Sequence, residues 1–256
     1  MLKEKLIGDI NMLAFLFKIK NVLFGTQWKY CLTNSAVRLL GSSKLSVGKK
    51  CRILHSKITL SNGATLILHD NVLLDHVNIF VDSGFVEINE FSILSRGNNY
   101  MNPSFIVNTG TLKLGHHSRL SPYRVWIRYG GKLTIGDYTC VNENSEIRVD
   151  DQVSIGSYVG ISYYTCVWDT NTHMIYTPEV REGLLRKYFP YFWKEKEKPS
   201  TAPVVICDNC WIGEHSSILK GTTLGRNVIV GFNTMVINKE IPDNSKVVQD
   251  INLRVL

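Results

Sequence analysis

Residues 204–236 read VVICDNCWIGEHSSILKGTTLGRNVIVGFNTMV and repeat a pattern of six residues. Each copy begins with an aliphatic residue, often followed by glycine, and carries a small or modest residue four places after the aliphatic one. A unit this short cannot bury its own apolar edge, so it must stack on neighbouring copies. One inward aliphatic per strand and a tight turn at glycine predict a three-sided coil. The clearest copies are Ile212-Gly213…Ser216, Leu224-Gly225…Val228 and Val230-Gly231…Thr234.

The same pattern appears earlier in the chain, so the coil extends well beyond this stretch. In a three-sided coil, positions 18 apart lie above one another; Ile206 and Leu224 are both aliphatic at that spacing. Before residue 110 the spacing drifts from six, and residues 98–103 predict a loop that leaves a coil. The earlier copies are Val47-Gly48…Cys51, Leu114-Gly115…Ser118, Ile135-Gly136…Thr139 and Ile155-Gly156…Val159.

The sequence divides into residues 1–43 and residues 44–256. In the first part apolar residues recur at helical spacing, which predicts a helical segment; in the second we predict an all-β domain of stacked coils. The apolar run 12–17 is too short to cross a bilayer, and no signal-peptide cleavage site follows it. We favour a helix that packs on the first coil or on another subunit. The alternative is a helix lying on an anionic membrane surface. We therefore expect a cytoplasmic protein, and under the alternative one that binds the inner face of the membrane.

The pattern stops between Asp169 and Pro203. A loop of about 170–203 in a compact domain is usually functional or disordered, and its many aromatic residues favour packing over a site. A basic and aromatic segment could also stack on single-stranded nucleic acid. Aromatic rings stack equally well on sugars, so we do not expect a nucleic-acid partner.

The chain has 256 residues, a net charge of +7 and 44% hydrophobic residues, which is ordinary for a globular protein except for its charge. The charge indicates an anionic partner: nucleic acid, an acidic membrane or a polyphosphorylated small molecule. Cys207 and Cys210 form one C-x-x-C pair, which could bind zinc or act in redox chemistry. No second pair completes four zinc ligands, and Cys210 occupies the small interior position of a repeat, so we favour packing.

Three stretches resemble the hexapeptide-repeat acyltransferases, in the branch that acetylates sugars and xenobiotics. Residues 167–173, VWDTNTH, resemble the segment that ends in the catalytic His of that branch. Residues 210–221, CWIGEHSSILKG, are similar to a coil of the family that reads W-I-G…I-L-x-G. Residues 223–242, TLGRNVIVGFNTMVINKEIP, are similar to its closing coils, which line the coenzyme A channel. The resemblance covers residues 44–256; the tail after residue 246 and the longer loop after His173 depart from the family. It implies a left-handed parallel β-helix and a homotrimer with active sites between subunits.

The resemblance also implies the chemistry: acetyl transfer from acetyl-CoA, without a metal, to the hydroxyl of a sugar or lipid-linked saccharide of a surface polysaccharide. It implies that His173 is the general base, a task that suits a pKa near neutrality. Asp169 could orient the imidazole or cap a turn, and Glu143 is a weaker candidate orienter. Asn142 and Asn144 could hydrogen-bond the acceptor or only form turns.

Trp211 is the aromatic candidate for the cofactor channel. It either packs between coils or subunits or forms a wall for the pantetheine arm, which we favour slightly. Glycines near that arm would permit close approach, and basic residues could meet the phosphates. The further candidates for cofactor contact are Gly160, Gly213, Gly231, Thr234 and Lys239, followed by Arg226 and Arg254.

Three other functions stay open. N-acetylation of an amino sugar is a close variant, because a neutral amine needs less help from a base. A zinc enzyme like the γ-type carbonic anhydrases would need three converging histidines, and the spacing of His116, His117, His173 and His215 does not resemble that family. A non-catalytic solenoid is disfavoured by the histidine beside an aromatic loop.

Overall fold

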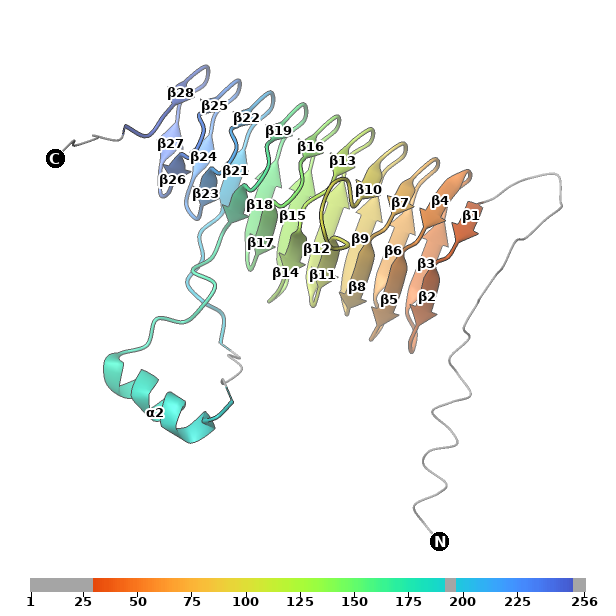
Figure 1. Ribbon diagram of the computed structural model, residues 1–256, viewed down its shortest axis with the longest axis horizontal. Coiled ribbons are helices and arrows are strands. Elements are labelled where there is room, and N and C mark those ends of the chain that lie inside the picture. Colours follow the sequence, from red (N-terminus) through yellow and green to blue (C-terminus); the bar gives the residue numbers. More distant parts are fainter. Residues whose placement is uncertain (1–29, 192–196, 251–256) are drawn as a thin grey trace, which may run out of the picture.

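The structure is a computed structural model that describes residues 30–191 and 197–250. Within these residues the chain winds into a parallel β-solenoid with three faces, formed by one sheet of ten strands and two sheets of nine (Figure 1). We number the sheets 1, 2 and 3 in the order in which each turn visits them. The edges are named by the sheets they join: edge 1–2, edge 2–3 and edge 3–1.

The strands follow this cycle from the first turn to the last. Sheet 1 holds β1 (Tyr30–Thr33), β4 (Cys51–Leu54), β7 (Leu73–Asp75), β10 (Ile93–Ser95), β13 (Arg119–Leu120), β16 (Cys140–Val141), β19 (Gly160–Ile161), β22 (Trp211–Ile212), β25 (Ile229–Val230) and β28 (Lys246–Val247). Sheet 2 holds β2 (Ala36–Leu39), β5 (Lys57–Ser61), β8 (Asn78–Asp82), β11 (Ser104–Val107), β14 (Arg124–Ile127), β17 (Glu146–Val149), β20 (Cys166–Trp168), β23 (Ser217–Leu219) and β26 (Met235–Val236). Sheet 3 holds β3 (Lys44–Val47), β6 (Thr65–Leu68), β9 (Gly84–Ile88), β12 (Gly110–Leu114), β15 (Gly131–Ile135), β18 (Gln152–Ile155), β21 (Val204–Ile206), β24 (Thr223–Leu224) and β27 (Glu240–Ile241).

The core is a set of aliphatic columns that run along the solenoid. Strands pair in register, so Val125, Ile147 and Val167 stack directly above one another, and all three are at most 1% exposed. Alternate residues of each strand face inward, as the pleat requires. Each turn therefore buries its apolar residues only by stacking on its neighbours, as the six-residue pattern predicts.

The small residue of each repeat also lies inside, where its hydrogen bond explains its identity. The Ser118 hydroxyl donates to the Gly136 carbonyl of the next turn (2.9 Å), and the Thr139 hydroxyl donates to Gly156 (2.8 Å). The thiol of Cys210 makes the equivalent bond to Gly225 (3.0 Å) and is 1% exposed. Its burial raises the pKa of the thiol, so packing explains this cysteine, as expected.

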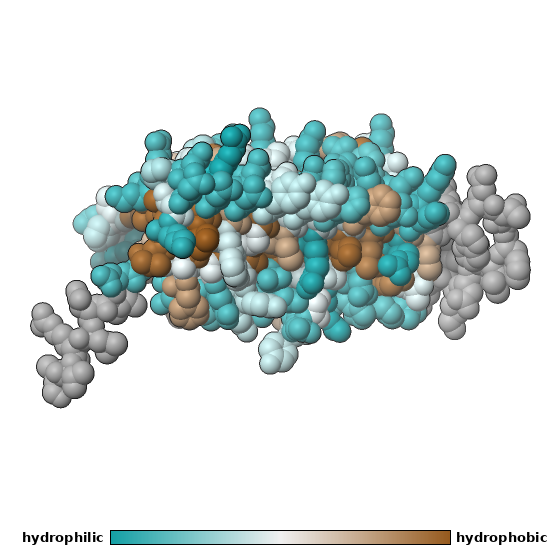
Figure 2. Space-filling model, turned by 90° about the horizontal axis from the view of Figure 1, so that it is seen from above, coloured by the Kyte–Doolittle hydropathy of each residue, from teal (hydrophilic) through white to brown (hydrophobic). Residues whose placement is uncertain are grey.

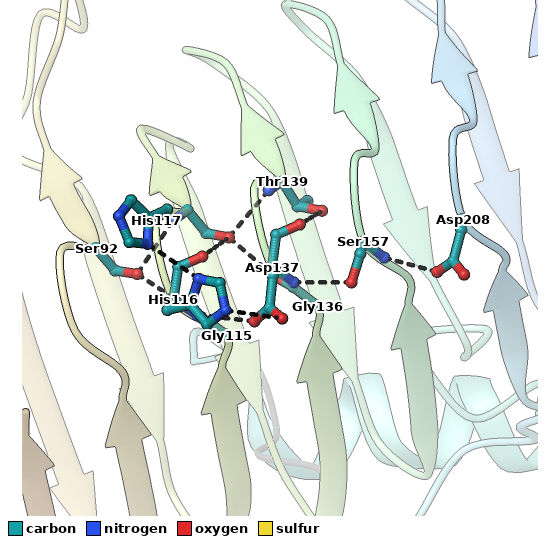
Figure 3. A network of polar contacts seen from close by, with 10 residues as sticks. Ser92, Gly115, His116, His117, Gly136, Asp137, Thr139, Ser157 and Asp208 are labelled. Atoms are coloured by element: carbon teal, nitrogen blue, oxygen red, sulfur yellow. Dashed lines mark hydrogen bonds and ion pairs between the residues drawn. The ribbon is translucent and has the colours of Figure 1, made fainter.

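The glycine of the repeat is required where edge 3–1 turns. A Cβ on Gly115 would collide with the side chain of Asp137 in the next turn. That carboxylate accepts a hydrogen bond from the His116 N–H (2.9 Å), and Asp208 accepts one from Ser157 N–H (2.8 Å) (Figure 3). An acidic residue thus caps the turn before it, and glycine leaves the space for its side chain.

The solenoid begins earlier than predicted. The boundary at residue 44 is wrong, because β1 and β2 already pair in parallel with β4 and β5. Leu32 of β1 and Val37 of β2 pack against the core, so residues 30–39 form strands of the solenoid. Residues 1–29, which carry the rest of the predicted helix, lie outside the described residues.

The two predicted interruptions are present. A loop leaves the coil between β10 and β11, at residues 98–103, and a longer excursion separates β20 from β21. The excursion contains a helix that the sequence analysis did not predict, α2 (Pro178–Tyr188), with proline in its first turn, Glu179 near its start and Arg186 near its end. No residue of α2 is buried, and Figure 1 shows it standing away from the solenoid. The expectation that this loop packs over a site is therefore not met within one chain.

Candidate active site

His173 lies on edge 2–3, at the base of the long excursion, and its side chain is exposed. The chain reaches it directly from β20, which stacks on β17 below and β23 above. The base of the excursion is fixed by an antiparallel bridge between Thr170 and Thr201. The Asn171 N–H also donates to the Ser200 carbonyl (3.0 Å). The exposed imidazole thus follows directly on a segment, residues 170–171, that is hydrogen-bonded to the segment with which the excursion ends, residues 200–201.

Asp169 is fully buried four residues before His173. Its two carboxylate oxygens accept the backbone N–H groups of Asp150 (2.8 Å) and Asp151 (2.7 Å) in the preceding turn. Loss of hydration raises the pKa of this carboxyl, and the N–H bonds offset that only in part. The arrangement is that of a turn cap, one of the two roles that the sequence left open; orienting the imidazole stays a prediction.

A buried ion pair lies beside the same turn and was missed by the sequence analysis. Arg128 donates from Nε and Nη2 to the two oxygens of Asp150, at 2.8 and 2.7 Å, and Asp150 is fully buried. The Thr170 hydroxyl donates to the same carboxylate (2.6 Å). The two charged residues are 22 apart in sequence, the length of one irregular turn, so only an assumed coil register could have found them.

Four of the predicted cofactor residues lie on two other parts of the turn, sheet 1 and edge 1–2. On sheet 1, Gly160 and Trp211 are register partners, and the indole, 61% exposed, lies over the glycine. Gly213 and Gly231 occupy edge 1–2 in adjacent turns. A Cβ on Gly213 would lie 2.7 Å from the Gly231 carbonyl carbon, so coil stacking alone requires glycine there.

Two further candidates for cofactor contact differ in accessibility. Thr234 is 2% exposed, and its hydroxyl donates inside the coil to the Phe232 carbonyl (3.3 Å). Lys239 is exposed on edge 2–3, two turns beyond His173, and its carbonyl accepts the Thr223 N–H (2.8 Å). Arg226 lies on edge 3–1, whereas Arg254 lies outside the described residues.

The candidates for acceptor contact lie on edge 1–2, at the other end of sheet 2 from His173. Asn144 has a φ of 60°, typical of an Asn turn residue, and its N–H donates to Asn99 Oδ1 (2.8 Å). Asn142 is half-buried and accepts a weak bond from the Cys140 thiol (3.4 Å). Glu143 is 2% exposed and accepts from Asn98 N–H (3.2 Å), so it fastens the loop at residues 98–103.

One chain therefore does not gather these residues around His173. Among the cofactor and acceptor candidates that the structure describes, only Lys239 shares the edge of His173, whereas the sheet 1 and edge 1–2 candidates are separated from it by at least the width of sheet 2. The histidines weighed as zinc ligands are also dispersed: His116 and His117 on edge 3–1, His215 on edge 1–2. Within residues 30–191 and 197–250, no three His, Cys, Asp or Glu side chains are grouped to hold a metal ion.

No helix in the described part of the chain has the length and apolar character needed to cross a membrane.

Comparison with known proteins gives a match to one family model over part of the chain and several relatives. Residues 203–238 match the family model for the bacterial transferase hexapeptide (six repeats). The probable acetyltransferase Rv3034c of Mycobacterium tuberculosis is 26% identical over 132 residues, 52% of this chain and 37% of the relative.

Two relatives come from Escherichia coli. One is named "putative colanic acid biosynthesis acetyltransferase WcaF" and is 26% identical over 143 residues, 55% of this chain and 66% of the relative. The other is galactoside O-acetyltransferase, 28% identical over 137 residues, 51% of this chain and 60% of the relative. The chain thus spans less than two thirds of the length of each of these relatives.

Proposed function

We propose, on the premise that this chain belongs to the hexapeptide-repeat transferases, that it moves an acetyl group from acetyl-CoA to a sugar hydroxyl. The observation that carries the proposal is an exposed His173 rising from an immobilised turn on edge 2–3, in the segment that resembles the catalytic segment of the family. The names of the two Escherichia coli relatives, a galactoside O-acetyltransferase and a colanic acid biosynthesis acetyltransferase, support a saccharide as acceptor. We also propose that the solenoid of this chain winds left-handed, as in that family.

The proposed role of His173 is proton transfer. Its neutral imidazole removes the proton of the acceptor hydroxyl while that oxygen attacks the thioester carbonyl. The tetrahedral intermediate then collapses, the carbon–sulfur bond breaks, and the imidazolium returns the proton to the leaving thiolate. Holding both substrates in line supplies much of the rate. Asp169 contributes by fixing the turn from which the imidazole emerges.

The remaining site residues require a second copy of the chain in this proposal. Sheet 1, edge 1–2 and the start of sheet 2 carry an apolar surface over the last turns, exposed by between 40% and 75% at each residue: Trp211, Ile229, Phe232, Met235 and Val248. Figure 2 shows hydrophobic side chains gathered toward the C-terminal end of the solenoid. Exposed apolar area of this kind marks interaction surfaces. A homotrimer would cover it and bring Trp211 and Gly160 of one copy toward His173 of the next.

Two measurements test this proposal. Release of the coenzyme A thiol is followed with a panel of neutral, acidic and lipid-linked saccharides, and acetylated product is identified by mass spectrometry. We expect thiol release that depends on a saccharide. Light scattering is expected to give three times the chain mass of 29.1 kDa. Failure of every saccharide to stimulate thiol release would contradict the activity, and a monomer would contradict the shared site.

A further inference from the structure

Three successive turns are joined by hydrogen bonds at edge 2–3, and the joined groups converge on the turn that precedes His173. Arg128 follows β14, Asp150 follows β17 and Thr170 follows β20. The guanidinium binds the Asp150 carboxylate through two parallel bonds, and this geometry combines charge with a fixed orientation. Because Asp150 is fully buried and Arg128 is 14% exposed, water screens the pair little.

The same guanidinium reaches beyond its carboxylate. Arg128 Nη2 donates to the Thr172 carbonyl (3.3 Å), which belongs to the peptide bond that leads into His173. The Thr172 N–H donates to the Thr170 hydroxyl (3.0 Å), and that hydroxyl donates to Asp150. Both backbone polar groups of Thr172 are therefore tied to the buried pair.

Thr172 needs such restraint because of its backbone conformation. Its φ is 67°, in the left-handed region that a β-branched residue rarely adopts. A conformation of this kind persists only where the surroundings over-determine it, and such residues cluster at functional sites. The two tethers from Arg128 and Thr170 are the groups that hold it here.

We propose that Arg128 is a positioning residue for the proposed base: clamped by Asp150, it fixes the Thr172 carbonyl and so sets the direction in which His173 leaves the solenoid. This inference rests on the proposed role of His173 and extends it to a residue two turns away. Arg128 touches no reacting atom; it acts through the backbone of the turn.

The chain offers a matched control on the same strand. Arg124 also lies over the Trp126 ring, at 4.8 Å from its centroid against 4.5 Å for Arg128. It also pairs with a carboxylate of the next turn, Glu146, through Nε at 2.6 Å. Within the described residues, however, the hydrogen bonds of Arg124 do not extend to residues 169–173. The two arginines differ in their reach to the His173 turn.

The test compares Arg128→Lys with Arg124→Lys in the full chain. Lysine keeps a cation beside each carboxylate, the fully buried Asp150 and the 13% exposed Glu146, but loses the planar fork, so neither variant removes the charge of the partner cation. Amide hydrogen exchange of the peptide spanning residues 169–174 is measured first, because it needs no activity. We expect exchange at least about tenfold faster in Arg128→Lys and unchanged in Arg124→Lys.

Saccharide-dependent acetyl transfer is measured next, with kcat and both KM values. For Arg128→Lys we expect kcat to fall about tenfold or more while KM for acetyl-CoA changes less than about twofold, and for Arg124→Lys we expect neither to change. Unchanged exchange in Arg128→Lys would overturn the clamp. Faster exchange with an unchanged kcat would overturn the positioning role.

Loss of the proposed function itself would look different. A wild-type chain without transferase activity would contradict the function, while the exchange measurement would still decide whether the clamp exists. Thr170→Val tests the same turn from its other tether if Arg128→Lys does not fold. Thr170 is 5% exposed, so valine fills its space while removing the hydroxyl, and faster exchange of residues 169–174 is again expected.

Discussion

On edge 3–1 and at the His173 turn on edge 2–3, an Asp carboxylate accepts backbone N–H groups of the preceding turn, but the two carboxylates differ in burial. On edge 3–1, Asp137 accepts one N–H from the preceding turn while 42% of its side chain stays exposed. At the His173 turn, Asp169 accepts two such N–H groups and is fully buried, beside the Arg128–Asp150 pair. Loss of a solvent-exposed capping carboxylate costs little stability, because water can replace it as the acceptor. A buried cap allows little local change, so it suits the place where one side chain must be held for chemistry.

Removing the two caps gives the largest expected difference. Asp169→Ala leaves the N–H groups of Asp150 and Asp151 without their acceptors in a buried site, and each loss costs roughly 1–3 kcal/mol. We expect the free energy of unfolding to fall by about 3 kcal/mol. Asp137→Ala exposes its N–H partner to water, so we expect a fall of about 1 kcal/mol or less. Urea denaturation of both variants measures the difference, and equal losses would refute the comparison.

The glycine beside an edge 3–1 cap should be the next most sensitive position. In Gly136→Ala the new Cβ would lie 2.6 Å from the Ser157 nitrogen of the next turn, so two backbones must move apart. Overpacking of this kind costs about 1–3 kcal/mol. Gly130→Ala, on edge 2–3, serves as the control: its Cβ meets nothing within 4 Å, although its φ of 78° adds backbone strain. A larger loss in Gly130→Ala than in Gly136→Ala would show that conformation, and not stacking, selects these glycines.

The pH dependence of stability separates the buried cap from the exposed one. Burial raises the folded-state pKa of Asp169 above the ordinary value of 3.8. Above that value the unfolded chain loses this proton before the folded chain does, so the contribution of Asp169 to stability declines as pH rises through the raised pKa.

We therefore expect the difference in unfolding free energy between the wild type and Asp169→Asn to shrink as pH rises from 4 to neutrality, as measured by urea denaturation. A difference that grows over this range would show that the N–H bonds outweigh the loss of hydration.

The smallest expected effect lies in the excursion. Gly183 is within α2, has open space around its Cα and does not need a positive φ. Gly183→Ala should stabilise the helix by up to about 1 kcal/mol through its intrinsic propensity. Exchange of the α2 amides should slow, while that of residues 169–174 stays unchanged because their bonds lie at the base of the loop. Slower exchange at both places would show that the helix and the turn form one unit.

The features that depend on the six-residue period could be predicted from the sequence. Ile212, Gly213 and Ser216 each have a fixed role in one turn, so stacking, the interior small residue and the place of the excursion could be read from spacing. Residues 30–39 were included in the helical segment because the six-residue pattern first becomes recognisable at Val47, whereas their two strands, β1 and β2, lack the glycine of the repeat. Helix α2 carried an amino-terminal proline and a basic last turn, but no apolar face signalled it.

The clamp could not be found in the same way. Arg128 and Asp150 are polar residues 22 positions apart in a region where turn length varies, and only the three-dimensional register shows that they meet. The sequence also did not show that Trp211, Gly213 and His173 lie on different faces of the solenoid. Resemblance to a family identifies candidate site residues but does not say whether they come together within one subunit. Both features depend on contacts between turns, which spacing within a turn does not specify.

The most direct test of the account is the rate of saccharide-dependent thiol release in His173→Ala against His55→Ala. His55 is an exposed histidine on edge 1–2 of the early turns, stacked on His76, and has no part in the proposed site. We expect His173→Ala to lose about 10²–10⁴-fold in kcat, the usual contribution of a general base, with unchanged thermal unfolding. His55→Ala should retain full activity. A His173→Ala protein within a few-fold of the wild-type rate would contradict the claim that this turn holds the catalytic base.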